Sequence, residues 1–193
     1  MGFLGIGLPF VLAAWGYALC ACGDLRPSIS DYYALRTRDA LVGTLVAIAW
    51  FLYTYRGYDR QDDWAGNVAG FCALGVAFFP SVAGGWQEVL HFTSALGLFL
   101  TLAYFSLILF TKTGGHPTPE KRIRNRVYRA CGWIMLACIA LMGAYYLFLR
   151  GSALTALKPV FWLESFALWA FGVSWFIKGE TLWRDPVPSR SGA

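Results

Sequence analysis

The chain has 193 residues, of which 58% are hydrophobic and 14% are charged, and its formal net charge is +5. Soluble domains carry about 25% charged residues, so this composition, with a mean hydropathy of +0.51, excludes an ordinary soluble globular protein. The positive charge lies beside apolar runs rather than in an aromatic and basic nucleic-acid motif, so we expect membrane lipids as partners and no nucleic acid.

Six apolar segments follow one another along the chain. A helix needs about 20 apolar residues to cross the hydrocarbon core of a bilayer, and the predicted spans are residues 2–22, 40–55, 65–82, 89–110, 127–148 and 160–177. The first segment lacks a preceding basic region and is long for a signal peptide, so we interpret it as a span. The short connections predict that helices adjacent in sequence pack as antiparallel neighbours.

The expected fold is therefore all-α, a polytopic transmembrane bundle of about six helices. Residues 1–180 are predicted to form one transmembrane domain, and residues 181–193 a short cytoplasmic tail. The small residues Gly66 and Gly70 in the third span favour close helix packing. Pro9 and Pro80 are expected inside spans, where proline kinks a helix.

The distribution of Lys and Arg predicts the orientation. The stretch from Lys112 to Arg129, around the connection between the fourth and fifth spans, holds six of the sixteen basic residues. If the amino terminus is cytoplasmic, eleven of the sixteen lie on the cytoplasmic side and five on the other. Basic residues concentrate on the cytoplasmic side of membrane proteins, so we predict that both termini are cytoplasmic.

Two ionisable residues fall inside predicted spans, where such groups are costly and need a structural or functional reason. Glu164 lies about five residues into the last span, which is ~7 Å at ~1.5 Å per residue, and His91 lies near the start of the fourth span. The predicted topology places both at similar depth on the non-cytoplasmic side. A carboxylate and an imidazole in partial burial suit acid–base chemistry; alternatively, they are satisfied polar groups that hold two helices together.

The connection after the first span is polar and short enough to stay near these helix ends. We therefore predict a polar pocket near the outer leaflet that binds a ligand. Its candidate residues are Ser28, Ser30, Asp31, Glu88, His91, Ser94 and Glu164. The candidate catalytic residues are Asp31, His91 and Glu164.

Other groups offer weaker indications of chemistry. Asp59, Asp62 and Asp63 could hold a divalent cation, but pairing with nearby arginines and the basic connection is the favoured interpretation. The two histidines, His91 and His116, are predicted on opposite sides, so we expect no metal and no cofactor. The five cysteines form no disulfide framework, and Cys20 with Cys22 is the one pair that merits a redox test.

Several runs of the sequence resemble a group of uncharacterised bacterial six-helix integral membrane proteins. They are RDALVG, FLYTYRGYDRQDDWAGN, ALGVAFFP, HFTSALGLFLTLAYFSLILFTKT, KRIRNRVYR and FWLESFALWAFGVSWFIKGE. This resemblance covers most of the chain and implies a multi-pass protein of the bacterial cytoplasmic (inner) membrane.

Fragments also resemble the superfamily of membrane hydrolases that includes alkaline ceramidases and adiponectin receptors. That family surrounds zinc with a serine, an aspartate and three histidines, and Ser28, Ser30, Asp31 and His91 match parts of the pattern. The remaining histidines and the seventh helix have no counterpart here, so the resemblance does not carry zinc hydrolysis over to this chain.

The leading functional hypothesis is non-enzymatic. The protein binds a lipid headgroup or a small polar ligand, or serves as a membrane subunit that contacts a protein partner within the membrane. A lipid-directed hydrolase or transferase is the first alternative. A proton-coupled small-molecule carrier with Glu164 as its proton site is the second.

Overall fold

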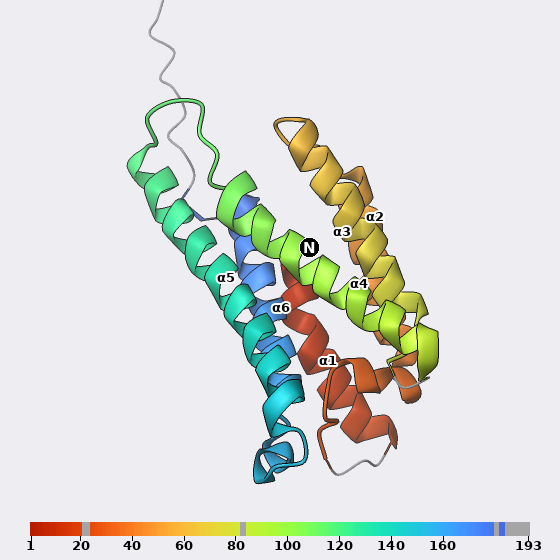
Figure 1. The fold of residues 1–193 in the computed structure, drawn as a ribbon. Coiled ribbons are helices and arrows are strands. Elements are labelled where there is room, and N and C mark those ends of the chain that lie inside the picture. Colours follow the sequence, from red (N-terminus) through yellow and green to blue (C-terminus); the bar gives the residue numbers. More distant parts are fainter. Residues whose placement is uncertain (21–23, 82–83, 180–181, 184–193) are drawn as a thin grey trace, which may run out of the picture.

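The computed structural model of the chain is an all-α bundle (Figure 1) and describes residues 1–20, 24–81, 84–179 and 182–183. Its helices within that part are α1 (Gly2–Cys20), α2 (Arg38–Thr54), α3 (Arg60–Phe78), α4 (Gly85–Tyr104), α5 (Pro119–Ala144) and α6 (Pro159–Lys178). The π-helical turns η2 (Phe105–Leu109) and η3 (Tyr145–Leu149) continue α4 and α5, and the short 3₁₀ helices η1 (Ser30–Ala34) and η4 (Ala153–Leu157) lie in connections. The predicted all-α class with six helices is confirmed.

Three helices are long and apolar enough to cross a membrane. Among the described residues these are Gly85–Leu109, Pro119–Leu149 and Pro159–Lys178, of 25, 31 and 20 residues. α1 is apolar over a shorter length, Gly2–Ala18. The predicted tail lies almost wholly outside the described residues.

Two helices, α3 and α5, begin five or more residues before the predicted spans. α3 begins at Arg60 because Asp59 accepts hydrogen bonds from the backbone of Gln61 and Asp62, and Asp62 reciprocates in a capping box. α5 begins at Pro119, behind the N-cap Thr118. Polar first turns thus extend both helices beyond their apolar lengths.

Of the two prolines predicted inside spans, one lies within a helix and the other does not. Pro9 lies inside α1, as expected. α3 ends at Phe78, so Pro80 follows the helix and does not kink it. The prediction for Pro80 is corrected because the backbone is already extended at Phe79.

Small residues allow α2 and α3 to pack closely. A Cβ atom at Gly66 would lie 2.7 Å from the carbonyl oxygen of Leu52, and one at Gly70 would lie 3.0 Å from that of Ala49. The predicted close approach at Gly66 and Gly70 is therefore present. α3 also packs on α4 and α5 on α6, as sequence neighbours should, whereas α1 packs mainly along α6 rather than α2.

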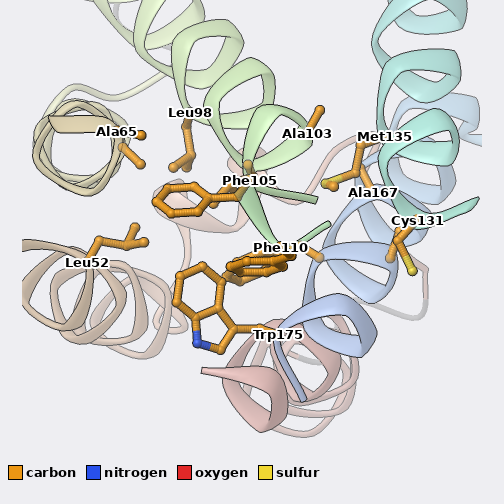
Figure 2. Close-up of a cluster of buried hydrophobic side chains, with 14 of the residues drawn as sticks. Leu52, Ala65, Leu98, Ala103, Phe105, Phe110, Cys131, Met135, Ala167 and Trp175 are labelled. Carbon is orange, nitrogen blue, oxygen red and sulfur yellow. The ribbon is translucent and has the colours of Figure 1, made fainter. Parts of the chain in front are cut away.

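Aromatic side chains fill the centre of the bundle around Trp175 of α6 (Figure 2). The ring centroid of Trp175 lies 5.1 Å from that of Phe110, 5.2 Å from Tyr55 and 5.4 Å from Phe105. Edge-to-face aromatic pairs of this kind contribute about 0.5–1.5 kcal/mol beyond the area they bury. This cluster holds α6 against the end of α2 and the end of α4.

The described cysteine side chains take no part in disulfides. Cys72, Cys131 and Cys138 are free thiols in buried or half-buried surroundings. The Cys20 and Cys22 pair lies outside the described side chains.

The two ends of the bundle carry different polar groups. One end, where α2, α4 and α6 begin, carries η1 and Glu164, and we call it the Glu164 end. The other, where α3 and α5 begin and α6 ends, carries Asp59, Lys112 and Lys178, and we call it the Lys112 end.

Candidate functional site

A tight turn before η1 positions the polar groups of the Glu164 end. The backbone N–H of Ser28 donates to Asp31 Oδ2 at 3.1 Å, and the N–H of Asp31 donates to Ser28 Oγ at 3.0 Å. The N–H of Phe161 donates to the carbonyl of Pro27 at 3.0 Å, which fixes the turn to the first turn of α6. Ser28 and Asp31 thus shape the turn that presents Ile29 and Ser30.

Glu164 reaches from α6 to this turn. Its Oε2 accepts the backbone N–H of Ile29 at 2.5 Å, and its Oε1 lies 3.5 Å from Ser30 Oγ. A hydrogen bond to an ionised carboxylate is roughly twice as strong as one between neutral groups. The side chain therefore points into the protein and joins η1 to α6.

His91 reaches the same turn from α4 and is 2% exposed. Its Nδ1 lies 2.7 Å from the carbonyl oxygen of Phe79, and its Nε2 lies 3.0 Å from Ser30 Oγ. A carbonyl oxygen only accepts hydrogen bonds, so Nδ1 carries a proton. Nε2 is therefore the ring nitrogen that can exchange a proton with Ser30.

Ser30 bridges the two ionisable groups through one hydroxyl. If His91 is neutral, Ser30 donates to Nε2, and a protonated Glu164 can donate to Ser30 Oγ. If His91 is charged, Nε2–H donates to Ser30 Oγ, and the hydroxyl donates to an ionised Glu164. Both arrangements hold the same number of protons, so Ser30 can relay one between the carboxyl and the imidazole.

Ser30 and Glu164 border a cavity of about 650 Å³ at the Glu164 end. We call it the polar pocket. Its charged lining residues are Asp31, Glu88, Arg150, Lys158 and Glu164, and its other lining residues include Ser28, Ser30, Ser81, Phe92, Tyr145, Tyr146 and Thr155. Tyr145 donates its hydroxyl to Thr155 Oγ1 at 3.1 Å, which joins η3 to η4 across the pocket wall. Acidic and basic side chains thus line the same cavity.

Ser30 and Glu164 also line a second, smaller cavity. This apolar space of about 50 Å³ lies among leucines of α1, α2, α4 and α6. The bridge between Ser30 and Glu164 therefore forms part of the boundary between the polar pocket and the apolar interior.

The structure brings together most of the candidate residues. Ser28, Ser30, Asp31, Glu88 and Glu164 line the polar pocket, and His91 contacts Ser30. Ser94 does not join them, because its hydroxyl packs against Gly75 between α3 and α4. Its helical spacing from His91 suggested a shared face, but Ser94 lies one turn further into the bundle, where α3 covers it.

Three residues that line the pocket were not among the predicted site residues: Arg150, Lys158 and Tyr146. Arg150 and Lys158 flank the connection between the fifth and sixth predicted spans, which the topology places on the same side as Glu164. That shared side was the indication in the sequence. The guanidinium of Arg150 lies 5.9 Å from the Tyr146 ring centroid, and Lys158 Nζ lies 3.4 Å from Asp24 Oδ2.

Metal-binding groups do not gather in the part of the chain that the structure describes: it contains no cluster of three His, Cys, Asp or Glu side chains suited to an ion. His116 lines a pocket at the Lys112 end, away from His91. At that end Asp59 Oδ2 accepts from Lys112 Nζ at 2.8 Å, as the favoured interpretation of the acidic residues predicted.

Comparison with known proteins gave no match: neither a family model, nor a curated protein, nor a solved structure corresponds to the chain. Function is therefore inferred from the geometry of the site.

Proposed function

We propose that this protein spans the membrane six times and that its polar pocket binds a zwitterionic lipid headgroup. The observation that carries this proposal is the meeting of three carboxylates and two cationic side chains around one cavity of about 650 Å³. An ammonium group would lie against Asp31, Glu88 and Glu164. A phosphate would lie against Arg150 and Lys158, because charge-assisted hydrogen bonds are the strongest that side chains make.

Membrane insertion is supported by the three long apolar helices and by the remaining helices packed beside them. The first turns of α5 and the connection before them lie at the Lys112 end and hold six of the sixteen Lys and Arg residues, which favours a cytoplasmic position for that end. The Glu164 end then faces the opposite leaflet, and both termini are cytoplasmic. The resemblance to bacterial membrane proteins agrees with an inner-membrane location.

Aromatic side chains support a lipid over a fully soluble ligand. Phe92 and Tyr146 line the polar pocket and are 43% and 39% exposed, and their rings lie 6.0 Å apart. In a bilayer, such partly exposed rings contact lipid near the interface. A headgroup in the pocket could therefore extend its acyl chains past these rings.

The test measures thermal unfolding of the detergent-purified protein with dioctanoyl phosphatidylethanolamine. We expect this lipid to raise the unfolding midpoint, because a ligand that binds only the folded state stabilises it. The Glu88→Gln variant removes a pocket charge that makes no described hydrogen bond, and it should weaken the effect. Asp39→Asn, an exposed change in the first turn of α2, is the matched control.

Dioctanoylglycerol, which lacks the headgroup, should give no comparable rise. The proposal fails if the two lipids stabilise the protein equally, or if Asp39→Asn weakens the response as much as Glu88→Gln.

A second candidate function, a lipid-directed hydrolase, is favoured by the 3.0 Å distance between Ser30 Oγ and His91 Nε2. This is the distance of an activated nucleophile from its base, and the carbonyl of Phe79 orients the base. Ser30 Oγ would attack an ester carbonyl while His91 takes its proton and passes it to the departing alcohol. Water would then cleave the acyl-serine, which returns the serine and releases the acid.

A fluorophosphonate probe tests this candidate directly, because such probes modify activated serines. We expect labelling at Ser30 that Ser30→Ala abolishes and His91→Gln strongly reduces. Ser81 lines the same pocket, and its hydroxyl makes no hydrogen bond to a base, so Ser81→Ala should leave labelling unchanged. Labelling that survives Ser30→Ala, or no labelling of the folded protein, eliminates the hydrolase.

A further inference from the structure

A second large pocket lies at the Lys112 end, with a volume of about 660 Å³. We call it the basic pocket. The basic side chains that line it are Lys112, His116, Lys121, Arg124 and Lys178. Among the described residues that line it, none is acidic. Its charge is thus of one sign, unlike that of the polar pocket.

The cationic side chains converge from separate parts of the chain. Lys112 follows η2, Lys121 belongs to the first turn of α5, and Lys178 ends α6. Lys121 Nζ donates to the carbonyl of Phe110 at 2.8 Å, and Lys178 Nζ lies 5.5 Å from the Phe110 ring centroid. Both ammonium groups therefore lie near Phe110, and an anion bound beside that residue would be attracted to both.

The start of α5 adds to the positive potential. Thr118 caps this helix of 26 residues by accepting the N–H of Lys121 at 3.0 Å, and both residues line the basic pocket. The N-terminus of a long helix carries partial positive charge and favours bound anions. The helix dipole and the cationic side chains thus favour the same class of ligand.

The nearby acids contact Lys112 from outside the pocket lining. Lys112 Nζ lies 2.8 Å from Asp59 Oδ2 and 3.7 Å from Asp62 Oδ1. These contacts hold the lysine in position at the pocket edge. Arg124 is 3% exposed and donates to the carbonyl of Trp183 at 2.6 Å, so its guanidinium is also held in place.

We propose that the basic pocket binds a phosphate group, either on an anionic lipid headgroup or as a free soluble anion. A phosphate group has several oxygens that can accept from lysine, arginine and hydroxyl donors at once. Tyr58, an exposed aromatic side chain of the kind found at membrane interfaces, lines the pocket. This site is separate from the polar pocket and does not depend on the function proposed there.

The experiment measures the affinity of the purified full chain for dioctanoyl phosphatidic acid, with inorganic phosphate and dioctanoyl phosphatidylcholine as the other arms. The test variant combines Lys112→Gln with Lys178→Gln. The matched control combines Arg126→Gln with Arg129→Gln, which removes the same charge from exposed positions of α5 outside the pocket. Unfolding midpoints without lipid establish that each variant is folded, and Lys178→Gln alone serves if the pair is not.

We expect phosphatidic acid to bind and phosphatidylcholine to bind much more weakly. The test variant should lose about tenfold or more in affinity, as expected for lost hydrogen bonds to charged groups, while the control stays near the native value. If inorganic phosphate binds as tightly as phosphatidic acid, the site takes a soluble phosphate. No binding of either phosphate probe, or an equal loss in both charge-matched variants, overturns the proposal.

Discussion

The two ends of the bundle use polar residues in opposite ways. At the Glu164 end, His91 and Glu164 both contact Ser30, and each has a further backbone partner. At the Lys112 end, cationic side chains face a pocket that has no acidic residue in its described lining. Shared hydrogen bonds in the first group join α4, α6 and η1, whereas the basic side chains that line the second pocket favour an outside anion.

The largest expected effect comes from removing the carboxylate at the Glu164 end. Glu164→Ala leaves the N–H of Ile29 without its acceptor, and an unsatisfied buried donor costs about 1–3 kcal/mol, more next to charge. Unfolding in detergent should show a loss of about 2–3 kcal/mol. Glu164→Gln keeps one acceptor oxygen and should lose less; an equal loss in both variants would mean that the acceptor role is not what stabilises this end.

The next effect comes from the cap of α5 at the Lys112 end. Thr118→Ala should destabilise the protein by about 1 kcal/mol, which is typical for loss of an N-cap side chain. Thr113 lines the basic pocket, as Thr118 does, but caps no helix, so Thr113→Ala is the control. Similar midpoints for the two variants would show that the cap contributes little.

Lys112→Gln should have a smaller effect that depends on salt. The Lys112–Asp59 pair is partly exposed, and added salt screens such pairs. The difference in midpoint between native protein and Lys112→Gln should shrink between low and high NaCl, while that for Glu164→Gln should stay nearly constant. If added salt reduces the midpoint difference equally for Lys112→Gln and Glu164→Gln, the two ends do not differ in how solvent screens their charges.

The smallest effect is a pH dependence of the same ion pair. The hydrogen bond from Lys112 lowers the pKa of the Asp59 carboxyl below its ordinary value, and that carboxylate raises the pKa of Lys112. A carboxyl whose pKa is lower in the folded state contributes stability above its unfolded pKa of about 4. That contribution disappears as the pH falls through the lower folded pKa.

The midpoint difference between native protein and Lys112→Gln should therefore be constant near neutral pH and shrink below about pH 4. A difference that grows on acidification would contradict the assigned direction of the Asp59 pKa.

Much of the fold follows from the sequence because apolar length predicts helices. The starts of α3 and α5 were missed because Asp59 and Thr118 cap polar turns that hydropathy does not detect. The pairing of α1 with α6 was also missed, because it depends on the close approach of Gly2 and Gly172, 170 positions apart in the chain.

The candidate site was predictable in its residues and not in its connections. Topology placed His91 and Glu164 at one depth, and both contact the turn before α2. That Ser30 is the residue joining them depends on the turn made by Ser28 and Asp31, which no periodic pattern describes. Arg150 and Lys158 were missed because residues in short connections point in directions that helical spacing does not determine.

The bridge through Ser30 can be observed most directly by nitrogen NMR of histidine. The chain has two histidines, so in the His116→Gln variant all histidine ring-nitrogen signals come from His91. We predict a protonated Nδ1, and an Nε2 signal that shifts on Ser30→Ala and also on Glu164→Gln, because the carboxyl acts through the serine. The bridge from His91 through Ser30 to Glu164 would be contradicted by a proton on Nε2 alone. It would also be contradicted by an Nε2 signal that neither substitution shifts.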